Sequence, residues 1–384
     1  MEKPKVRISV RNLVEFILRS GDPDNSRGSS GDKEAMLKGG RLHRKIQRSM
    51  KGNYQAEVSL KRESEYEDVI IQVEGRADGI FTEDGEFWID EIKGTYGNLQ
   101  AMEVPVPVHR AQAMCYGWIY GEKEGLSQIG IQMTYSHLDT EDTRRFREIF
   151  SMEELKNWYQ KLLDDYHKWI SCSLSWKKER NASMKDLQFP FPYREGQREI
   201  VSGVYHTVSS KKTLFVQAPT GVGKTMSAIF PSVRAIGEGK GETLFYLTAK
   251  TITGTVAWEA FHTLRENGLK FKVTAITAKE KLCFLDSPEC TPEKCPYAKG
   301  HFDRVNDAVY ELWTTEEVYS REVIRAHAEK WQVCPFEMCL DLSVWVDGVI
   351  CDYNYAFDPN VHLKRFFGEN ISGDYIFLID DCLL

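Results

Sequence analysis

The stretch FVQAPTGVGKTMSAI, residues 215–229, joins an apolar run, a glycine-rich turn and the start of a helical pattern. Gly221 and Gly223 let backbone N–H groups curl around phosphate oxygens, and the helix N-terminus adds a favourable dipole. Lys224 is expected to reach the β and γ phosphates of a nucleotide, and Thr225 to ligate Mg²⁺. The expected nucleotide-binding residues are Ala218, Pro219, Thr220, Gly221, Val222, Gly223, Lys224 and Thr225.

A series of short apolar runs surrounds this loop, and helical patterns follow several of them. The runs are TLFVQA, TLFYLTA, FKVTAIT, VDGVICD and YIFLID. Continuous apolar strands of this kind are typical of a parallel sheet covered on both faces, so we expect an α/β fold. The last strand ends in two carboxylates. Asp380 is the candidate magnesium ligand and Asp381 the candidate water-activating acid, although solvated acids also cap many strand ends.

The first part of the chain predicts a separate α/β domain. Helices are expected at 9–20, 33–50, 107–121 and 152–170, and strands at 54–61, 67–74, 77–82, 86–92 and in QIGIQMTYS. The following stretch, SCSLSWKKERNASMKDLQFPFPY, loses periodicity and gains charge and proline, which predicts a linker. The expected domains are therefore 1–170 and 191–384, joined by a linker at 171–190.

Four cysteines form a candidate metal site. Cys283, Cys290 and Cys295 are closely spaced, and Cys334 follows 39 positions after the last of them. Four thiolates can hold zinc or an iron–sulfur cluster. Structural zinc sites usually pair their cysteines at tight spacing, so the wide gaps here favour iron–sulfur. Disulfides are not expected, because the start MEKPKVRISV shows no signal peptide and no run is long enough to span a bilayer, which predicts a cytoplasmic protein.

The order of APTGVGKT, LFYLTAKT, CFLDSPECTPEKCPYAKG, VCPFEMCLDL and ICDYNYAFDP resembles the first motor domain of XPD/DinG-type iron–sulfur superfamily 2 DNA helicases. The resemblance covers about residues 188–380. It implies a RecA-like P-loop domain that binds ATP and Mg²⁺, with an inserted, mainly helical domain at 279–345. The resemblance further implies that Cys283, Cys290, Cys295 and Cys334 hold a [4Fe–4S] cluster.

The same resemblance assigns other residues. Tyr193, Arg194 and Gln197 belong to the segment that contacts adenine, and Thr248, Lys250 and Thr251 approach the DNA backbone. DYNYAF is expected to line the DNA path, with Tyr353, Tyr355 and Phe357 stacking on single-stranded bases or simply packing in the core. Where these helicases continue Asp-Glu-Ala-His, this chain has Asp380-Asp381-Cys382, and the second motor domain is missing. The chain alone is therefore expected to bind nucleotide weakly and not to unwind DNA processively.

In the first domain, GRADGIFTEDGEFWIDEIKG places Asp78 on one strand and both Glu91 and Lys93 on the next. Two acids and a lysine at one place can hold one or two magnesium ions and polarise a water molecule for attack on a phosphodiester. Residues 8–170 resemble PD-(D/E)XK nucleases of the RecB type. That resemblance implies Asp78 and Glu91 as metal ligands, Lys93 as the catalytic lysine, Glu57 and His43 as auxiliary ligands, and Gln112 and Tyr116 as the helix pair of the family.

Two functions remain open at the level of the sequence. The first is an ATP-dependent helicase with an attached nuclease, acting on single-stranded and forked DNA in repair or replication. The second is a truncated DNA-binding protein with a zinc or empty cysteine site and inert acids. The net charge of −7 gives no general support to nucleic-acid binding, but local basic surfaces matter more than the total.

Overall fold

The computed structural model describes residues 3–23, 32–50, 53–219, 221–249, 251–286, 289–368 and 373–380; the side chains of 32–36 and 251–253 are not described. The chain divides into two compact units. Unit 1 contains Met1–Ser20 and Asp24–Ser171, and unit 2 contains Gly21–Pro23 and Cys172–Leu384. None of the described helices combines the length and the apolar character that a membrane crossing needs.

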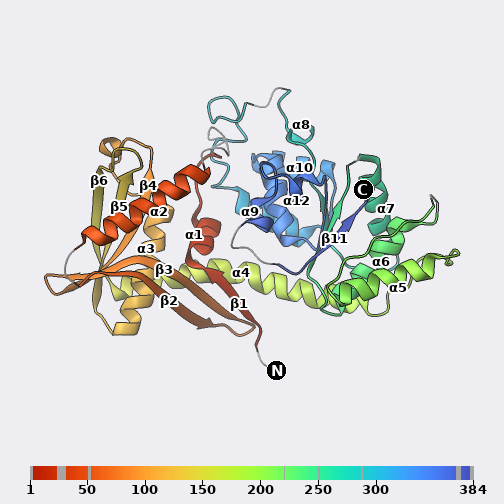
Figure 1. Ribbon diagram of the computed structural model, residues 1–384, viewed down its shortest axis with the longest axis horizontal. Coiled ribbons are helices and arrows are strands. Elements are labelled where there is room, and N and C mark those ends of the chain that lie inside the picture. The colour runs from red at the N-terminus through yellow and green to blue at the C-terminus, as the bar shows by residue number, and fades with distance from the viewer. Residues whose placement is uncertain are drawn as a thin grey trace. The chain divides into compact units, whose positions relative to one another are not determined.

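Unit 1 is built on a mixed sheet. Its strands are β1 (Lys5–Ser9), β2 (Gln55–Glu65), β3 (Ile70–Glu83), β4 (Glu86–Thr95), β5 (Gln128–His137) and β6 (Thr143–Ser151). They follow the order β1-β3-β4-β5-β6, and β2 pairs with β3 (Figure 1). The β1–β3 and β4–β5 pairs are parallel, and the other pairs are antiparallel.

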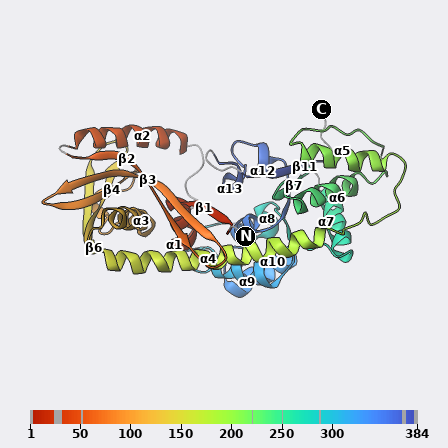
Figure 2. The ribbon, with the colours of Figure 1, turned by 90° about the horizontal axis from the view of Figure 1, so that it is seen from below.

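Helices cover both faces of this sheet. They are α1 (Val10–Leu18), α2 (Asp32–Ser49), α3 (Pro107–Glu124) and α4 (Met152–Met184), with a short 3₁₀ turn, η2 (Leu99–Ala101). Leu42 and Ile46 of α2 pack on Ile92 of β4 and on Leu138. The helix α3 lies across the opposite face (Figure 2). The acids and the lysine of β3 and β4 therefore lie between an α2 layer and an α3 layer.

A tight turn sets the pairing of β3 and β4. Asp84 and Gly85 have φ angles of 52° and 83°, the left-handed pair that suits a two-residue hairpin. The resulting register pairs Gly79 with Asp90, which places Asp78 beside Glu91. The two strands expected at 67–74 and 77–82 are one continuous strand, β3, because the chain stays paired through Gly75.

Unit 2 contains a parallel sheet. Its strands are β7 (Thr243–Leu247), β8 (Val273–Ala275), β9 (Val318–Tyr319), β10 (Gly348–Cys351) and β11 (Tyr375–Ile379), in the order β11-β7-β10-β8-β9. The pairs β10–β7, β10–β8, β11–β7 and β8–β9 of this sheet are all parallel. The prediction of an α/β fold with a parallel sheet is confirmed.

The helices of unit 2 are α5 (Gln197–Ser209), α6 (Lys224–Gly237), α7 (Thr251–Glu266), α8 (Lys279–Leu282), α9 (Val305–Thr315), α10 (Arg321–Trp331), α11 (Pro335–Leu342), α12 (Asn354–Phe357) and α13 (Lys364–Phe367), with the 3₁₀ turn η3 (Ser343–Trp345). Side chains of α6 and α7 pack with Leu244 and Tyr246 in the main core. Phe245, which alternates with these two along β7, meets the aromatic rings of α13. Both faces of the sheet are thus covered.

The structure also differs from the sequence-based expectation in the run before the glycine-rich loop and in the expected linker. The run TLFVQA is not a strand, and Leu214, Phe215 and Val216 are exposed. An apolar run becomes a strand only where its backbone finds a partner, and none of the described strands pairs with this one. The expected linker is also largely helical, since α4 continues to Met184. Its later turns are anchored to the sheet of unit 2, which explains why charge and weak periodicity did not end the helix.

A buried ion pair anchors this part of α4. Arg180 Nη1 lies 2.7 Å from Asp347 Oδ1, and both side chains are about 95% buried, with exposures of 4% and 5%. The other oxygen of Asp347 accepts hydrogen bonds from Trp176 Nε1 and from the backbone N–H of Lys272, each 2.8 Å long. The carboxylate is therefore fully satisfied in a site that excludes water.

Removing one partner would leave a buried charge unpaired. Arg180→Ala is expected to lower the free energy of unfolding of unit 2 by about 3–5 kcal/mol. The matched control is Lys177→Ala on the same helix. It removes an exposed ion pair between α4 and Glu242, and it should cost less than about 1 kcal/mol. Urea unfolding measures both variants, and equal destabilisation by the two would contradict the anchoring role.

Candidate functional site

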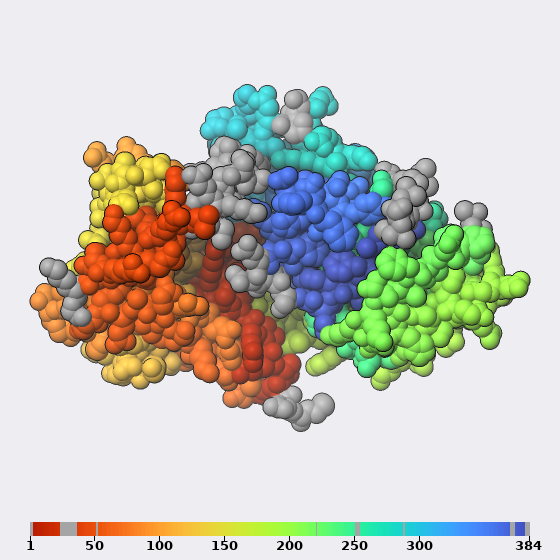
Figure 3. Space-filling view, in the orientation of Figure 1, coloured from red at the N-terminus to blue at the C-terminus, as the bar shows by residue number. Residues whose placement is uncertain are grey.

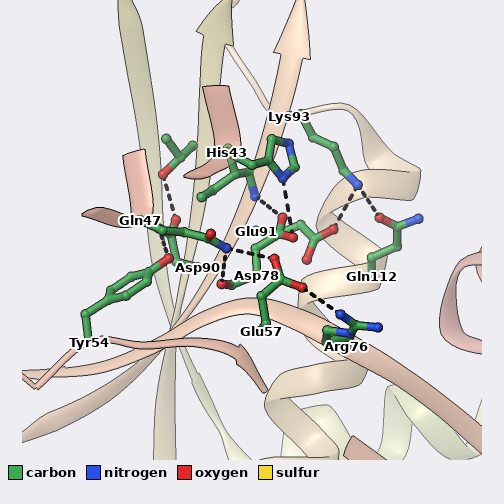
Figure 4. A network of polar contacts seen from close by, with 12 residues as sticks. His43, Gln47, Tyr54, Glu57, Arg76, Asp78, Asp90, Glu91, Lys93 and Gln112 are labelled. Atoms are coloured by element: carbon green, nitrogen blue, oxygen red, sulfur yellow. Dashed lines mark hydrogen bonds and ion pairs between the residues drawn. The ribbon is translucent and has the colours of Figure 1, made fainter. Parts of the chain in front are cut away.

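Polar side chains from four elements of unit 1 meet beside the β3–β4 hairpin. Figure 4 shows Asp78 of β3 and Glu91 of β4 at the centre, with Lys93 beside Glu91. The helix α2 contributes His43, and α3 contributes Gln112. The structure thus brings together the residues that the sequence suggested for this site.

Glu91 is the most deeply buried acid that faces these groups. Its Oε1 accepts a 2.8 Å hydrogen bond from Lys93 Nζ, which also donates to Gln112 Oε1 at 2.7 Å. Its Oε2 is buried and has no hydrogen-bond partner in the described structure. Burial, and secondarily the charge of Asp78, raises the pKa of Glu91 to about 7, although Lys93 opposes the shift. The carboxyl group can therefore gain or lose a proton near neutral pH.

Asp78 is held at both carboxylate oxygens. Its Oδ2 accepts a 2.7 Å hydrogen bond from the backbone N–H of Ile92, and its Oδ1 lies 3.6 Å from His43 Nδ1. Gln47, one helical turn after His43, donates to the backbone oxygen of Asp78 at 2.9 Å. The same Gln47 amide also donates to Glu57 Oε1 at 2.9 Å. Gln47 was not expected from the sequence, but its i,i+4 spacing from His43 is the signal that could have revealed it.

Glu57 has an unusual backbone conformation. Its φ is 58°, in the left-handed region that costs a non-glycine residue roughly 1–3 kcal/mol. It lies opposite Asp78, at the position where the β2–β3 register skips a pair. Its Oε2 lies 3.3 Å from Arg76 Nη1. The carboxylate of Glu57 is therefore engaged by Gln47 and Arg76, and its role as an auxiliary metal ligand stays a prediction.

Tyr116, the other expected helix residue, lies against β3. A Cβ atom added to Gly75 would come within 2.7 Å of the Tyr116 hydroxyl, so the absence of a side chain there allows the close approach. A backbone hydrogen bond links this tyrosine to Arg76. Tyr116 therefore fixes α3 against the strand that carries Asp78.

A second buried carboxylate, Asp90, was missed by the sequence analysis. Its oxygens accept hydrogen bonds from Thr134 Oγ1 (2.6 Å), Gln132 Nε2 (3.0 Å) and Tyr54 Oη (3.1 Å). Burial raises its pKa above the ordinary value. Tyr54 reaches it by crossing Gly79, where an added Cβ would lie only 1.9 Å from the hydroxyl. Three donors satisfy Asp90, so it braces the hairpin and is not open to a ligand.

The donor set of this site fits a hard cation. No group of three or more His, Cys, Asp or Glu side chains in the described residues is arranged to hold a metal ion. Mg²⁺, however, is commonly held by one or two carboxylates and keeps several water molecules. The unpartnered Oε2 of Glu91 and the neighbouring carboxylate of Asp78 are the oxygens that such an ion would use.

In the glycine-rich loop of unit 2, the lysine at the start of α6 hydrogen-bonds to the backbone of the loop. Gly221 and Gly223 have φ angles of 85° and 82°, and α6 begins at Lys224. Lys224 Nζ donates to the carbonyl oxygens of Ala218 at 2.9 Å and Pro219 at 3.2 Å. The ammonium group is thus held at the mouth of the loop, beside a helix N-terminus that favours anions.

Residues before α5 brace this loop. Arg194 hydrogen-bonds through Nη1 to the carbonyl oxygen of Gly221, and its backbone N–H donates to Gln197 Oε1 at 3.0 Å. A Cβ at Gly223 would lie 2.7 Å from Gln197 Nε2, so the amide lies directly on the loop. Tyr193 stacks on Phe189 with ring centroids 4.4 Å apart. The structure therefore gathers the expected adenine-contacting segment next to the phosphate loop.

Asp380 follows β11 and accepts a 2.7 Å hydrogen bond from Tyr246 Oη. Tyr353 Oη donates to the Asp380 backbone oxygen at 3.1 Å, and Tyr355 Oη to that of Thr277 at 3.3 Å, whereas Phe357 is 61% exposed. Thr248 is buried. Several expected site residues lie outside the described structure: Thr220, Lys250 and Asp381 entirely, and Thr251 for its side chain.

The four expected cluster cysteines are free thiols, and two of them share a cationic neighbour. Burial lowers the pKa of Lys279. A hydrogen bond to Cys290 and electrostatic interactions with Cys290 and Cys334 outweigh this effect, so that the pKa of Lys279 is raised. Burial raises the pKa of Cys334 to about 11. The four thiols do not form a metal-ready group in the described structure, so the iron–sulfur cluster stays a prediction.

Comparisons with known proteins give limited matches. No protein-family profile matches the chain. Over 47 residues, 12% of this chain, the sequence is 40% identical to a probable ATP-dependent helicase of Methanocaldococcus jannaschii, and the match spans 7% of that protein's length.

Two solved structures show weak likeness. One, the crystal structure of SSO0001, has 21% identity and a TM-score of 0.27 over 42% of this chain and 78% of that one. The other, an XPD helicase, has 16% identity and a TM-score of 0.32 over 49% of this chain and 32% of that one. Both TM-scores are too low to show a shared fold. The sequence match thus makes part of this chain similar to an ATP-dependent helicase, and the chain spans only a small part of that relative.

Proposed function

We propose that unit 1 is a metal-dependent nuclease attached to the ATP-binding motor unit of a DNA helicase. The observation that carries the nuclease proposal is the second oxygen of Glu91, which is buried without a partner beside Asp78 and Lys93. A buried acceptor left unpaired destabilises the fold, and a bound ion or water molecule is one way in which a native protein satisfies such a group. Glu91 and Asp78 would hold Mg²⁺, which would polarise a water molecule and the scissile phosphate.

The residues of the chain have distinct tasks in this proposal. Lys93 places a positive charge where negative charge builds up on the phosphate oxygens, and Gln112 holds the ammonium group in place. His43 and Gln47 position Asp78 from α2. The test is cleavage of labelled single-stranded DNA with Mg²⁺ or Mn²⁺ in the absence of ATP. Cleavage that stops on addition of EDTA supports the proposal, and no cleavage with either metal rejects it.

The motor proposal rests on the loop of unit 2 and on the helicase-like segment. Left-handed glycines, a lysine at the helix N-terminus and a bracing Gln197 are features that bind nucleotide phosphates. Asp380 would approach Mg²⁺ from the end of β11. Single-stranded or forked DNA is the proposed partner. Tyr353 is a candidate for contacting it, since it bonds to the backbone of Asp380 and could link the DNA path to the nucleotide site.

The raised pKa of Glu91 makes a pH-dependent prediction. Because this pKa is about 7 in the folded chain and 4.5 ordinarily, the metal-free protein loses stability as the pH rises from about 4.5 to about 7. A bound cation offsets that loss, since it needs the ionised carboxylate. The gain in Tm on adding Mg²⁺ should therefore be larger at pH 8 than at pH 6, with the apparent affinity falling about tenfold per pH unit below 7. In Glu91→Gln the gain should be small at both pH values, and an unchanged gain would contradict the assignment.

The cysteine site has a separate test. If Cys283, Cys290, Cys295 and Cys334 hold a [4Fe–4S] cluster, anaerobically purified protein should be brown and contain about four iron and four sulfide per chain. Cys334→Ser should remove most of this iron, whereas Cys115→Ser, which changes a buried thiol of unit 1, should leave it unchanged. Stoichiometric zinc, or no metal at all, would reject the cluster.

A further inference from the structure

The helix α2 exposes a row of arginines beside the acid site. Arg41, Arg44 and Arg48 are exposed, and none has an ion-pair partner among the residues that the structure describes. In the space-filling view the described part of α2 lies open on the surface of unit 1 (Figure 3). We call these three residues the arginine row. It stands out in a chain whose net charge is −7.

Two lysines of the same helix, Lys38 and Lys45, do have acidic partners. Lys38 Nζ lies 2.9 Å from Asp139 Oδ1, and Lys45 forms an ion pair with Glu141, both acids of the loop after β5. Among the described residues, Lys38 and Lys45 therefore have ion-pair partners and the arginine row has none. A general need to neutralise α2 does not explain this difference.

Helix geometry places the arginine row next to the residues that reach the acids. Successive residues turn by about 100°, so Arg44 and Arg48 lie one step around the helix from His43 and Gln47. Leu42 and Ile46, which face the sheet, lie about 100° to the other side. The paired Lys45 is a further step away from the site. Arg44 and Arg48 thus border the site on the flank that faces away from the sheet, and Arg41 lies further around the helix toward Lys45.

An acidic site needs such a row if its substrate is a polyanion. Asp78, Glu91 and Glu57 together repel the phosphates on either side of the bond to be cut. Arg41 and Arg48 are separated by about 10 Å along the helix axis, which allows contacts to more than one phosphate. Guanidinium groups bind phosphate oxygens in a bidentate manner, and unpaired ones lose no existing ion pair on binding.

We infer that the arginine row binds the phosphate backbone of a single DNA strand and holds this strand across the acid site. The inference rests on the proposed nuclease function of unit 1 and adds the surface that positions its substrate. His43 and Gln47 connect the two, since the helix that carries the row also contacts Asp78. The row contacts only phosphates, so it contributes no sequence preference.

The test compares two double variants of the full chain. Binding of a fluorescent single-stranded oligonucleotide is measured by anisotropy in EDTA, at several salt concentrations. Arg44→Ala/Arg48→Ala should weaken binding at least about fivefold and reduce the slope of log K against log salt by about 1.4, the value for two lost phosphate contacts. Lys38→Ala/Lys45→Ala removes the same charge from the paired flank and should leave the slope nearly unchanged. Equal effects of the two variants, or no effect of either, would overturn the inference.

Two further experiments distinguish a failure of this inference from a failure of the nuclease proposal. Glu91→Gln should bind DNA at least as tightly as the wild type in EDTA, because the row acts without metal and the variant removes one of the charges that repel phosphate. In cleavage assays the arginine variant should have a higher KM than the wild type and the same kcat. If the wild type itself does not cleave DNA, only the nuclease proposal is rejected. RNA of the same sequence carries the same phosphates and should bind the row about as tightly as DNA; a strong preference for RNA would require contacts to the 2′-hydroxyl groups and would overturn the assignment to DNA.

Discussion

Lys93→Ala is expected to reduce metal-dependent DNA cleavage by about 10²–10³-fold, the usual effect of removing one preorganised donor to a developing charge. The ammonium group lies 2.8 Å from Glu91 Oε1 and 2.7 Å from Gln112 Oε1, so its position is fixed before any substrate binds. Among the described residues, Lys93 is the ammonium group that forms an ion pair with Glu91. Initial rates at saturating DNA and Mg²⁺ measure the loss.

The matched control is Lys45→Ala, which removes an exposed lysine of α2 that pairs with Glu141. It should keep the wild-type rate. Gln112→Ala should have a smaller effect than Lys93→Ala, because the ammonium group would stay but lose its fixed position. Circular dichroism and DNA binding in EDTA should be unchanged in all three variants. A Lys93→Ala protein with wild-type activity would remove this residue from the catalytic assignment.

Lys224→Ala is expected to weaken ATP binding about 30–150-fold, since a charge-assisted hydrogen bond to phosphate contributes about 2–3 kcal/mol. Without nucleotide, the ammonium group is satisfied by the carbonyl oxygens of Ala218 and Pro219. Phosphate oxygens would take over these bonds. Titration with a fluorescent ATP analogue in the presence of Mg²⁺ measures the change.

Lys212→Ala serves as the control for this prediction, because it removes an exposed lysine that precedes the loop in the sequence. It should bind the analogue as the wild type does. Cleavage of DNA in the absence of ATP should be the same for wild type, Lys224→Ala and Lys212→Ala, because the nucleotide loop lies in unit 2 and the acid site in unit 1. Equal nucleotide affinity of Lys224→Ala and wild type would contradict the phosphate-binding role.

Much of the acid site follows from short-range features of the sequence. The EDGE turn predicts a hairpin, and the hairpin register then places Asp78 beside Glu91. The two-residue alternation of β4 puts Lys93 on the same side as Glu91. Gln112 and Tyr116 are one helical turn apart on α3, so a single face presents both. These residues could be grouped without knowledge of distant contacts.

Other parts depend on pairings far apart in the chain. Asp90 is satisfied by Gln132 and Thr134, which reach it only because β5 pairs with β4. The positive φ of Glu57 has no sequence signal, since nothing in QAEVS marks a left-handed residue. These features reflect tertiary structure and not local preference.

The same reason explains the errors in unit 2. The run TLFVQA has the composition of a buried strand, but composition cannot supply a neighbouring strand, and the run remains unpaired among the described strands. The second half of α4 has weak periodicity because Arg180 and Trp176 bind one acid rather than an apolar surface. A polar anchor of this kind hides a helix from pattern analysis.

The central claim is that Asp78 and Glu91 bind a divalent cation, and that this ion activates a water molecule to cleave a DNA strand. Calorimetric titration of Mn²⁺ into the wild type and into Glu91→Gln at pH 8, without nucleotide, tests it most directly. The account predicts saturable binding by the wild type, with at least a tenfold loss of affinity in the variant. Equal affinities in the two proteins, or no binding to the wild type, would contradict it.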